Sequence, residues 1–512
     1  MKKLLMNKTA AVIVFAMIVS VFTPIIAFAA SFVNVSNNGN VVTGSITLTD
    51  AEYTLLSDQS KVAVSVYGKN GDVSTVYATY DASVGHGTFK FTHTITQDTY
   101  FYYPLDPTKK TQYFTYTAPV FGGGGFFLPE PINADGTVNR DALLAALKAS
   151  DNTVVSSKSD VVFLPADILI QGKSLTIVLE NGTSYTLPIA ALKLEELAKS
   201  LGVELKDLVI RVELKQVTGD TATKITDAVT KAGGKELATA VDFKVIAVAN
   251  GKEQVIDSFN QYVSRTIVLK EAAASNDNLV GVVFDPATGK LSYVPATFVT
   301  KDGKTVSTLK RNGNSIYTVI QTKAVSFTDL AGNWAQKDVE ALAGKMIVNG
   351  TSANKFEPKR SITRAEFAAM VVRALGLEVS GTASQFKDVA SNQWYAATVA
   401  TAVKAGLITG YEDGTFKPNA NITRKELSAI IARAMKFAGK DVTLTDAQVS
   451  TALASFKDAS SLGWAKGEVA VVVSEGIVKG QTATTVVGNA NANRAEAATM
   501  IARFLGNVGF SN

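Results

Sequence analysis

The chain of 512 residues contains no cysteine and two histidines. Without cysteine there can be no disulfide, thiol nucleophile or thiolate metal site, so each domain must be held together by burial alone. No third metal ligand accompanies His86 and His93, and we interpret them as ordinary surface residues. Proline is also scarce, whereas 46% of the residues are apolar. This composition indicates folded domains rather than a disordered chain.

A large excess of charge is absent as well. The formal net charge is +5, and Lys2, Lys3 and Lys8 belong to residues 1–29, which contain no acid, so the remainder carries +2. A nearly neutral chain is not expected to bind nucleic acid, and any recognition of anions must be local.

The N-terminus has the pattern of an export signal. After the three lysines, residues 10–22 are apolar, Pro24 follows, and Ala27-Phe28-Ala29 fits the small-x-small rule for cleavage. We predict a signal peptide over residues 1–29, with an uncleaved membrane anchor as the alternative. No other stretch approaches the roughly 20 apolar residues that cross a bilayer, so the mature chain is predicted to have no membrane span.

Residues 30–118 are predicted to form an all-β, sandwich-like domain. Short segments rich in Val, Thr, Tyr and Phe alternate with turn residues, which is typical of a sandwich of immunoglobulin size. The predicted strands are 41–49, 61–67, 73–80, 88–96 and 112–117. Four consecutive glycines and two prolines then mark residues 119–131 as a linker.

Residues 132–322 are predicted to form a β-rich middle region with a few helices. Segments 141–148 and 192–201 have helical spacing. Asn181-Gly182 and Asn250-Gly251 predict hairpins, because both residue types tolerate the positive φ of a tight turn. No catalytic motif or metal-binding loop occurs, so we predict no catalytic residue, metal site or cofactor. Pairs of acidic residues that the sequence cannot place leave a glycosidase open as an alternative.

The last third contains one unit written three times, over residues 325–378, 385–437 and 455–506. In each unit a tryptophan stands 30 positions, and a glycine 14 positions, before an arginine. These residues are Trp334, Gly350 and Arg364; Trp394, Gly410 and Arg424; Trp464, Gly480 and Arg494. A second arginine follows nine residues later. The fixed period indicates a repeat array, and each unit is predicted to be helix–loop–helix. Ten extra residues between units two and three fall in the connector 437–455.

The second helix of each unit begins with a predicted capping box. The capping residues are Thr363 and Glu366, Thr423 and Glu426, and Asn493 and Glu496. The arginine after each cap is not needed for capping and faces the positive end of the helix dipole. We therefore expect it to hold an anion together with free backbone N–H groups. The alternative is an ion pair with Asp329, Asp388, Asp458 or other acids of the array.

The order Phe-x-Asp, Trp-Ala/Tyr, Ile-x-x-Gly, Phe-x-Pro and Thr-Arg-Ala-Glu resembles the surface-layer homology repeat of bacterial envelope proteins. The resemblance covers about 325–506 and implies an all-α domain of three repeats packed as a pseudo-trimer, with binding grooves between neighbours. It also implies non-covalent attachment to the cell wall through a secondary wall polysaccharide, in many members one carrying a pyruvate ketal.

By the same resemblance, the three helix-start arginines are expected to bind the carboxylate. The repeated tryptophans are expected to be groove or core aromatics, and the repeated glycines to permit close backbone approach. Arg364→Ala combined with Arg424→Ala is then predicted to abolish wall binding and to leave the helix content intact. Unit three has Val486 and Gly488 where the others have Phe-x-Pro, so its groove is expected to be weaker or purely structural.

The sequence therefore predicts a multidomain, exported, non-enzymatic protein at the extracellular face of the cell wall. It would be a surface-layer subunit or an associated structural protein, with self-association in a lattice as a further interaction. The alternatives are an enzyme acting on polysaccharide, or an adhesin, attached by the same repeats and with its activity in residues 30–322.

Overall fold

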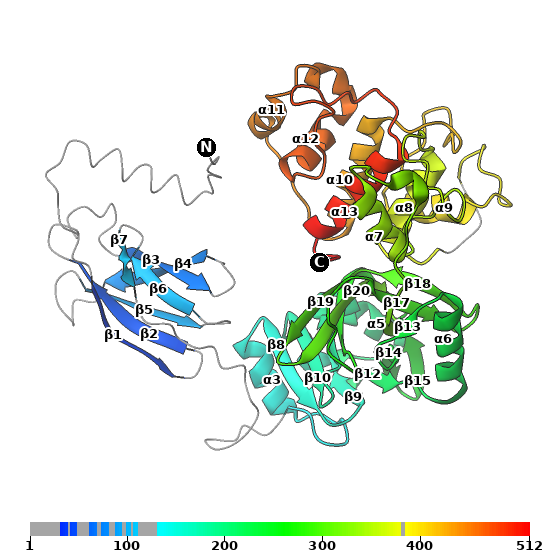
Figure 1. The fold of residues 1–512 in the computed structure, drawn as a ribbon. Helices are drawn as coiled ribbons and strands as arrows, with labels where there is room; N and C mark the ends of the chain where they lie inside the picture. Colours follow the sequence, from blue (N-terminus) through cyan, green and yellow to red (C-terminus); the bar gives the residue numbers. More distant parts are fainter. Residues whose placement is uncertain are drawn as a thin grey trace, which may run out of the picture. The chain divides into compact units, whose positions relative to one another are not determined.

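The computed structural model describes residues 31–38, 41–48, 61–68, 73–80, 88–94, 99–103, 106–110, 131–379 and 385–512 (Figure 1). Several predictions lie outside these residues. They are the signal peptide 1–29, the linker 119–131 apart from Pro131, the strand at 112–117, His86, and the side chain of His93. The chain divides into two compact units, residues 1–126 and 127–512.

The described residues of the first unit form one antiparallel sheet with the strand order β1-β2-β5-β4-β3-β6-β7. Its strands are β1 (Ser31–Asn38), β2 (Val41–Thr47), β3 (Lys61–Gly68), β4 (Val73–Tyr80), β5 (Thr88–Thr94), β6 (Thr99–Tyr103) and β7 (Asp106–Lys110). Alternate residues such as Ile46, Val64 and Phe89 are fully buried, as the period of two in a strand requires. The all-β prediction agrees with this sheet. A sandwich of two sheets is not confirmed, because the seven strands are hydrogen-bonded in a single order.

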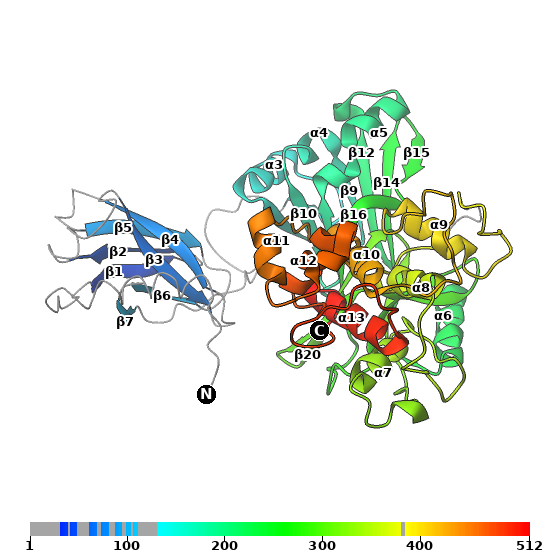
Figure 2. The same ribbon diagram turned by 90° about the horizontal axis from the view of Figure 1, so that it is seen from above.

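In the second unit, residues 131–322 form two further sheets (Figures 1 and 2). The six-stranded sheet contains, in order, β19 (Ala296–Lys301), β20 (Lys304–Gly313), β16 (Ser258–Val268), β11 (Ser184–Pro188), β10 (Ser174–Leu179) and β8 (Asn152–Ser157). The eight-stranded sheet contains β18 (Lys290–Val294), β17 (Leu279–Asp285), β21 (Ile316–Gln321), β14 (Val241–Ala249), β12 (Val209–Gln216) and β9 (Val161–Pro165), with β13 (Lys235–Glu236) and β15 (Lys252–Val255) paired alongside.

The predicted hairpins and helices of this region are present. Gly182 turns between β10 and β11, and Asn250 and Gly251, both at positive φ, turn between β14 and β15. The helices are α3 (Arg140–Ala149), α4 (Ala166–Leu169), α5 (Leu194–Leu201) and α6 (Gly219–Lys231). Helix α6 is not evident from the sequence, because its buried face is small: only Ile225 and Val229 of this helix are buried.

A fully buried cation joins the two sheets. Arg265 of β16 lies against the rings of Tyr185 from its own sheet and of Phe243 and Tyr317 from the other, with its Cζ atom 4.5–5.7 Å from the ring centroids. Its guanidinium also donates to the carbonyl of Arg311, 3.1 Å away. Cation–π contacts and carbonyl acceptors thus replace the water that this charge would otherwise need.

The repeats fold as helix–loop–helix units, as predicted. The helices are α7 (Gln336–Gly344) and α8 (Arg364–Ala374) in repeat 1, α9 (Ala396–Lys404) and α10 (Arg424–Phe437) in repeat 2, and α12 (Lys466–Ser474) and α13 (Arg494–Asn507) in repeat 3. Three backbone hydrogen bonds close a ring among them. Ile362 N–H donates to Ala492, Ala492 to Ile422, and Ile422 to Ile362, over 2.9–3.0 Å.

The repeats and the middle region share one hydrophobic core. A single cluster of buried side chains runs from Val282 of β17 to Phe510 beyond α13. Polar contacts reinforce it: Tyr262 Oη donates to the Leu375 carbonyl at 2.7 Å, and Arg311 Nε to the Gly376 carbonyl at 3.0 Å. The described residues 131–379 and 385–512 are therefore one packed body.

Candidate ligand-binding grooves in the three repeats

Each second helix of a repeat begins with a complete capping box. The side chains of Thr363, Thr423 and Asn493 accept from the backbone N–H three residues later, and the glutamate at that position accepts from the N–H of the cap. These reciprocal bonds fix the helix starts and hold each glutamate in place.

The helix-start arginines are buried and paired within the protein. Arg364 Nη1 lies 3.0 Å from Glu426 Oε1, Arg424 pairs with Glu496, and Arg494 Nη1 lies 3.6 Å from Glu366 Oε1. Each arginine of one repeat thus binds the capping glutamate of the next repeat, around a closed ring. At most 7% of each arginine is exposed. The expected open guanidinium fork is therefore mostly occupied, and the alternative of an ion pair with an acid of the array holds.

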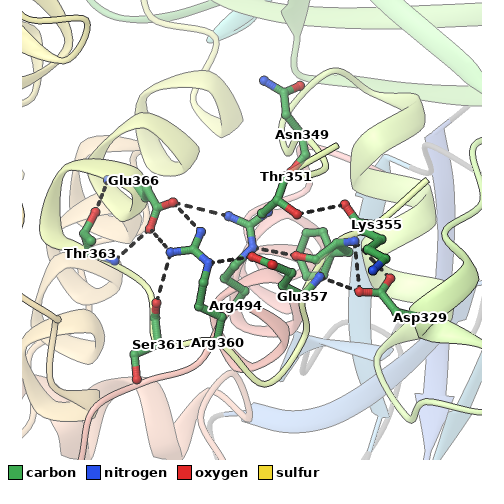
Figure 3. A network of polar contacts seen from close by, with 11 residues as sticks. Asp329, Asn349, Thr351, Lys355, Glu357, Arg360, Ser361, Thr363, Glu366 and Arg494 are labelled. Carbon is green, nitrogen blue, oxygen red and sulfur yellow. Dashed lines mark hydrogen bonds and ion pairs between the residues drawn. The ribbon is translucent and has the colours of Figure 1, made fainter. Parts of the chain in front are cut away.

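A backbone carbonyl completes each pair. Arg364 Nε donates to Phe416 at 2.8 Å, Arg424 Nε to Val486 at 3.0 Å and Arg494 Nε to Phe356 at 2.8 Å. Figure 3 shows the junction of repeats 3 and 1, where Glu366 faces both Arg494 and Arg360. The arginines therefore connect neighbouring repeats through both charge and backbone.

The aspartates of Phe-x-Asp do not pair with these arginines. Asp329, Asp388 and Asp458 instead accept two backbone N–H groups each from the loop before the second helix, over 2.7–3.0 Å. Burial tends to raise the pKa of Asp329, but the N–H groups of Phe356 and Glu357 outweigh it and hold that pKa below its usual value. In each loop the second donor has a positive φ, so the aspartate stabilises a strained turn.

The repeated glycines are required by close contacts inside the protein. A Cβ atom on Gly350 would lie 2.4 Å from the Ser352 carbonyl oxygen, and one on Gly410 would lie 2.1 Å from the ring of Phe386. Gly480 is equally crowded. The close backbone approach predicted for these glycines is thus an approach to their own loop and to the phenylalanine of Phe-x-Asp.

Three grooves lie between the repeats. In each groove, one repeat supplies its first arginine, the next supplies its glycine and second arginine, and the third supplies its tryptophan. We name them after their glycines. The Gly410 groove, about 540 Å³, is lined by Arg364, Gly410, Arg433 and Trp464. The Gly480 groove, about 380 Å³, is lined by Arg424, Gly480, Arg503 and Trp334. The Gly350 groove, about 280 Å³, is lined by Arg494, Gly350, Arg373 and Trp394. The predicted site residues are brought together, but across repeats rather than within one.

The tryptophans are exposed to solvent at the grooves. Trp334, Trp394 and Trp464 are 60–64% exposed. Exposed indole rings of this kind offer a flat apolar face and one N–H donor, which suits a sugar ring. Of the two roles that the sequence left open, groove or core, the structure places them at the grooves.

The second arginines of the repeats, which were not predicted as site residues, also line the grooves. They are Arg373, Arg433 and Arg503. Nine residues are two and a half turns of helix, so the first and second arginines of one helix face opposite sides and serve different grooves. Arg503 donates to the Ile477 carbonyl at 3.2 Å, and Arg433 lies 3.7 Å from Glu468. The repeated nine-residue spacing was the signal that could have identified them.

The grooves differ in charge. The lining of the Gly480 groove has Lys479, Arg424 and Arg503 against Glu496, a net charge of +2. The Gly350 groove has two arginines against Glu366, a net charge of +1. The Gly410 groove has two arginines against three carboxylates, those of Glu412, Asp413 and Glu426, a net charge of −1. Two grooves therefore suit an anion better than the third.

Comparison with known proteins identifies the repeats. A family model described as the S-layer homology domain matches residues 326–368, 385–428 and 455–498, which confirms the three predicted repeats. Among the described residues, no helix is long and apolar enough to cross a membrane.

Similar proteins include enzymes and S-layer proteins. Exoglucanase XynX of Acetivibrio thermocellus is 36% identical over 35% of this chain and 16% of its own length. Amylopullulanase of Thermoanaerobacterium thermosulfurigenes is 34% identical over 46% of this chain and 12% of its own. An S-layer protein of Bacillus thuringiensis subsp. finitimus is 33% identical over 35% of this chain and 21% of its own.

The chain thus spans a fifth or less of the length of most of these relatives, and the shared part does not distinguish an enzyme from a lattice protein. A solved structure of a family 64 β-1,3-glucanase from Paenibacillus barengoltzii matches with 12% identity over 52% of this chain and 64% of its own, at a TM-score of 0.11, too low to indicate a shared fold. The three domains and the surface-protein relatives indicate a location on the cell wall, at the extracellular face.

Proposed function

We propose that this chain, which carries three S-layer homology domains, attaches non-covalently to an acidic, pyruvylated secondary polysaccharide of the cell wall. The observation that supports this most is the ring of three grooves, each combining an exposed tryptophan with a second arginine. An indole face can stack on a sugar while a guanidinium binds its carboxylate.

The acidic group is assigned to the Gly480 and Gly350 grooves because their linings carry net positive charge. Within them Arg503 and Arg373 are the expected carboxylate ligands, while the buried Arg424 and Arg494 position the groove walls. Two sites on one rigid body bind a repeating polymer with avidity, since the second contact is intramolecular.

Co-sedimentation of the whole mature chain with purified wall sacculi tests the proposal. Binding is expected to untreated sacculi and not to sacculi stripped of secondary polymer by acid. Arg373→Gln combined with Arg503→Gln is expected to reduce binding at least tenfold, since each charged hydrogen bond contributes about 1.5–3 kcal/mol. The control is Lys337→Gln combined with Lys466→Gln, which removes the same charge from exposed positions outside the three grooves. Equal binding to stripped sacculi would mean that the ligand is peptidoglycan and not the secondary polysaccharide.

The proposed role of the anchored chain is structural, as an S-layer subunit or an associated protein that self-associates. The S-layer proteins among its relatives support this role. Formation of ordered sheets on removal of denaturant would favour a lattice subunit. The second candidate, an anchored enzyme acting on polysaccharide, is supported by relatives named as glycosidases. Release of reducing sugar from wall or plant polysaccharide by the purified chain would favour the enzyme.

A further inference from the structure

The longer connector between repeats 2 and 3 folds into an additional helix, α11 (Asp446–Leu453). Thr445 and Gln448 form a capping box at its start. Leu453 at its end is buried in a small core with Leu462 and Val469 of repeat 3. The ten extra residues are therefore an ordered part of the repeat domain with a defined face toward α12.

A hollow of about 300 Å³, open to solvent, lies between the connector, α10 and α12. Its wall includes the apolar side chains of Val442, Leu444, Val449 and Val471. This volume is at the lower end of the roughly 300–1,000 Å³ typical of small-molecule sites.

The hollow adjoins the Gly410 groove. Arg433 of α10 lines both, and Glu468 of α12 holds it at 3.7 Å. A ligand in the Gly410 groove that extends past Arg433 would therefore enter the hollow next.

The wall of this hollow includes a glycine that neither the backbone conformation nor a close neighbour requires. Gly467, the second residue of α12, occupies the position of Lys337 in repeat 1 and Ala397 in repeat 2, three residues after the tryptophan. Its φ is not positive, and a Cβ atom there would meet nothing within 4 Å. Glycine inside a helix costs roughly 0.5–1 kcal/mol relative to alanine. Open space therefore lies beside Gly467, so only a side chain much larger than alanine would reach into the hollow.

The charges around the hollow cancel. Lys436 lies 2.9 Å from Asp441, and Arg433 pairs with Glu468, so two cations face two carboxylates. Paired charges can exchange hydrogen bonds with hydroxyl groups, and the valine and leucine side chains can cover an apolar sugar face or an acetamido methyl group. Such a lining fits a neutral sugar better than an acidic one.

From these observations, and resting on the proposed attachment to wall polysaccharide, we infer that the Gly410 groove and this hollow form one extended site. It holds two successive sugars of the polymer, with the second, neutral sugar against α11 and Gly467. The Gly350 and Gly480 grooves then hold single acidic units.

Calorimetric titration of the whole mature chain tests this inference. The probes are wall polymer released from sacculi and fractionated into single repeating units and longer oligomers. Gly467→Phe fills the hollow, and Gly467→Ala is the matched control. We expect the unaltered chain and the alanine variant to bind oligomers about tenfold more tightly than single units, a difference of about 1.4 kcal/mol. The phenylalanine variant is expected to bind oligomers more weakly than the alanine variant and to bind single units as before. It should keep only the part of the gain that comes from simultaneous binding at the Gly350 and Gly480 grooves.

Thr443→Trp, at an exposed position on the connector side of the hollow, gives a second blocking variant if Gly467→Phe does not fold. Unchanged oligomer binding in a folded blocking variant would overturn the extended site, as would an equal loss for single units and oligomers. Failure of the anchoring proposal has a different signature, because Arg373→Gln combined with Arg503→Gln would then bind oligomers as tightly as the unaltered chain does.

Discussion

At the scale of single residues, the helix-start arginines have two roles, one in joining the repeats and one in lining the grooves. Each closes the ring of repeats through the next capping glutamate, and each also forms part of a groove wall. A buried ion pair contributes little net stability when intact, but removal of one partner leaves an unpaired buried charge. The same arginines are therefore poor choices for a test of binding alone.

Arg424→Met is expected to lower the free energy of unfolding by about 3–5 kcal/mol, because Glu496 and the Val486 carbonyl would lose their partner. For the same reason we no longer expect Arg364→Ala with Arg424→Ala to leave the helix content intact. Urea unfolding followed by circular dichroism measures the effect. Lys436→Ala, which breaks an exposed pair with Asp441, should cost at most about 1 kcal/mol. Similar values for the two variants would contradict the structural role of the ring.

Low pH should destabilise the repeats. Burial tends to raise the pKa of both Asp458 and Glu366. The backbone N–H groups of Val486 and Val487 nevertheless hold the pKa of Asp458 below its usual value, and Arg360 does the same for the pKa of Glu366. A carboxyl whose pKa is lowered on folding stabilises the fold above its unfolded pKa, and this contribution disappears as the pH falls.

We therefore expect the free energy of unfolding to decline as the pH drops below about 4.5, the range in which unfolded Asp and Glu take up protons. Asp329→Asn with Asp458→Asn should be less stable at pH 7 and should show a shallower decline, whereas Glu271→Gln, at an exposed position, should behave as the unaltered chain. Parallel pH profiles for all three proteins would argue against the loop aspartates as the source.

At the scale of elements, the second helix of each repeat connects two grooves. Its two arginines, nine residues apart, face opposite sides, so α8 contributes Arg364 to the Gly410 groove and Arg373 to the Gly350 groove. Changes in one helix can therefore affect two sites. The tryptophans, in contrast, stand just before the first helices and contribute to one groove each.

Trp334→Ala combined with Trp394→Ala is expected to weaken wall binding at least tenfold, because the indole faces of the Gly480 and Gly350 grooves are lost. The free energy of unfolding should change by less than about 1 kcal/mol, since both side chains are largely exposed. Co-sedimentation and urea unfolding give the two readouts. Val299→Ala, on the exposed face of β19, controls for loss of surface apolar area. A large loss of stability would mean that the rings support the fold instead.

At the scale of the whole molecule, the repeats cannot be separated cleanly from the middle region. Phe510, just after α13, is buried against Tyr262 of β16, with ring centroids 4.7 Å apart, and its carbonyl accepts from Tyr293 Oη at 3.1 Å. A boundary near residue 322 that is plain in the sequence is thus crossed by a continuous core.

Scanning calorimetry of residues 131–512 should show one cooperative transition. Phe510→Ala should shift that transition as a whole, with a cost of about 3–5 kcal/mol for a large buried aromatic side chain. Val379→Ala, an exposed apolar position near the same junction, should leave it in place. Two transitions, of which one shifts, would show that the middle region and the repeats unfold independently.

Much of this architecture follows from the sequence, because it depends on neighbours along the chain. The repeat spacing, the capping boxes and the hairpin turns depend on residues close together in the sequence. The roles of Trp334, Thr363 and Gly182 could therefore be predicted from the sequence. The β1, β6 and β7 strands and α6 escaped prediction. Serine and asparagine dominate β1, β6 and β7 have five residues each, and α6 has a narrow apolar face, so each leaves little pattern.

Only the tertiary structure decided which partners the charged residues have. Arg364 meets Glu426, 62 positions away, and Arg494 meets Glu366 because the ring of repeats closes. No periodicity encodes that closure, which depends on the packing of three amphipathic units around one core. The sequence alone therefore determined that three S-layer homology repeats are present. The structure decided that each first arginine pairs with the capping glutamate of the next repeat, and that first and second arginines from different repeats line the same grooves.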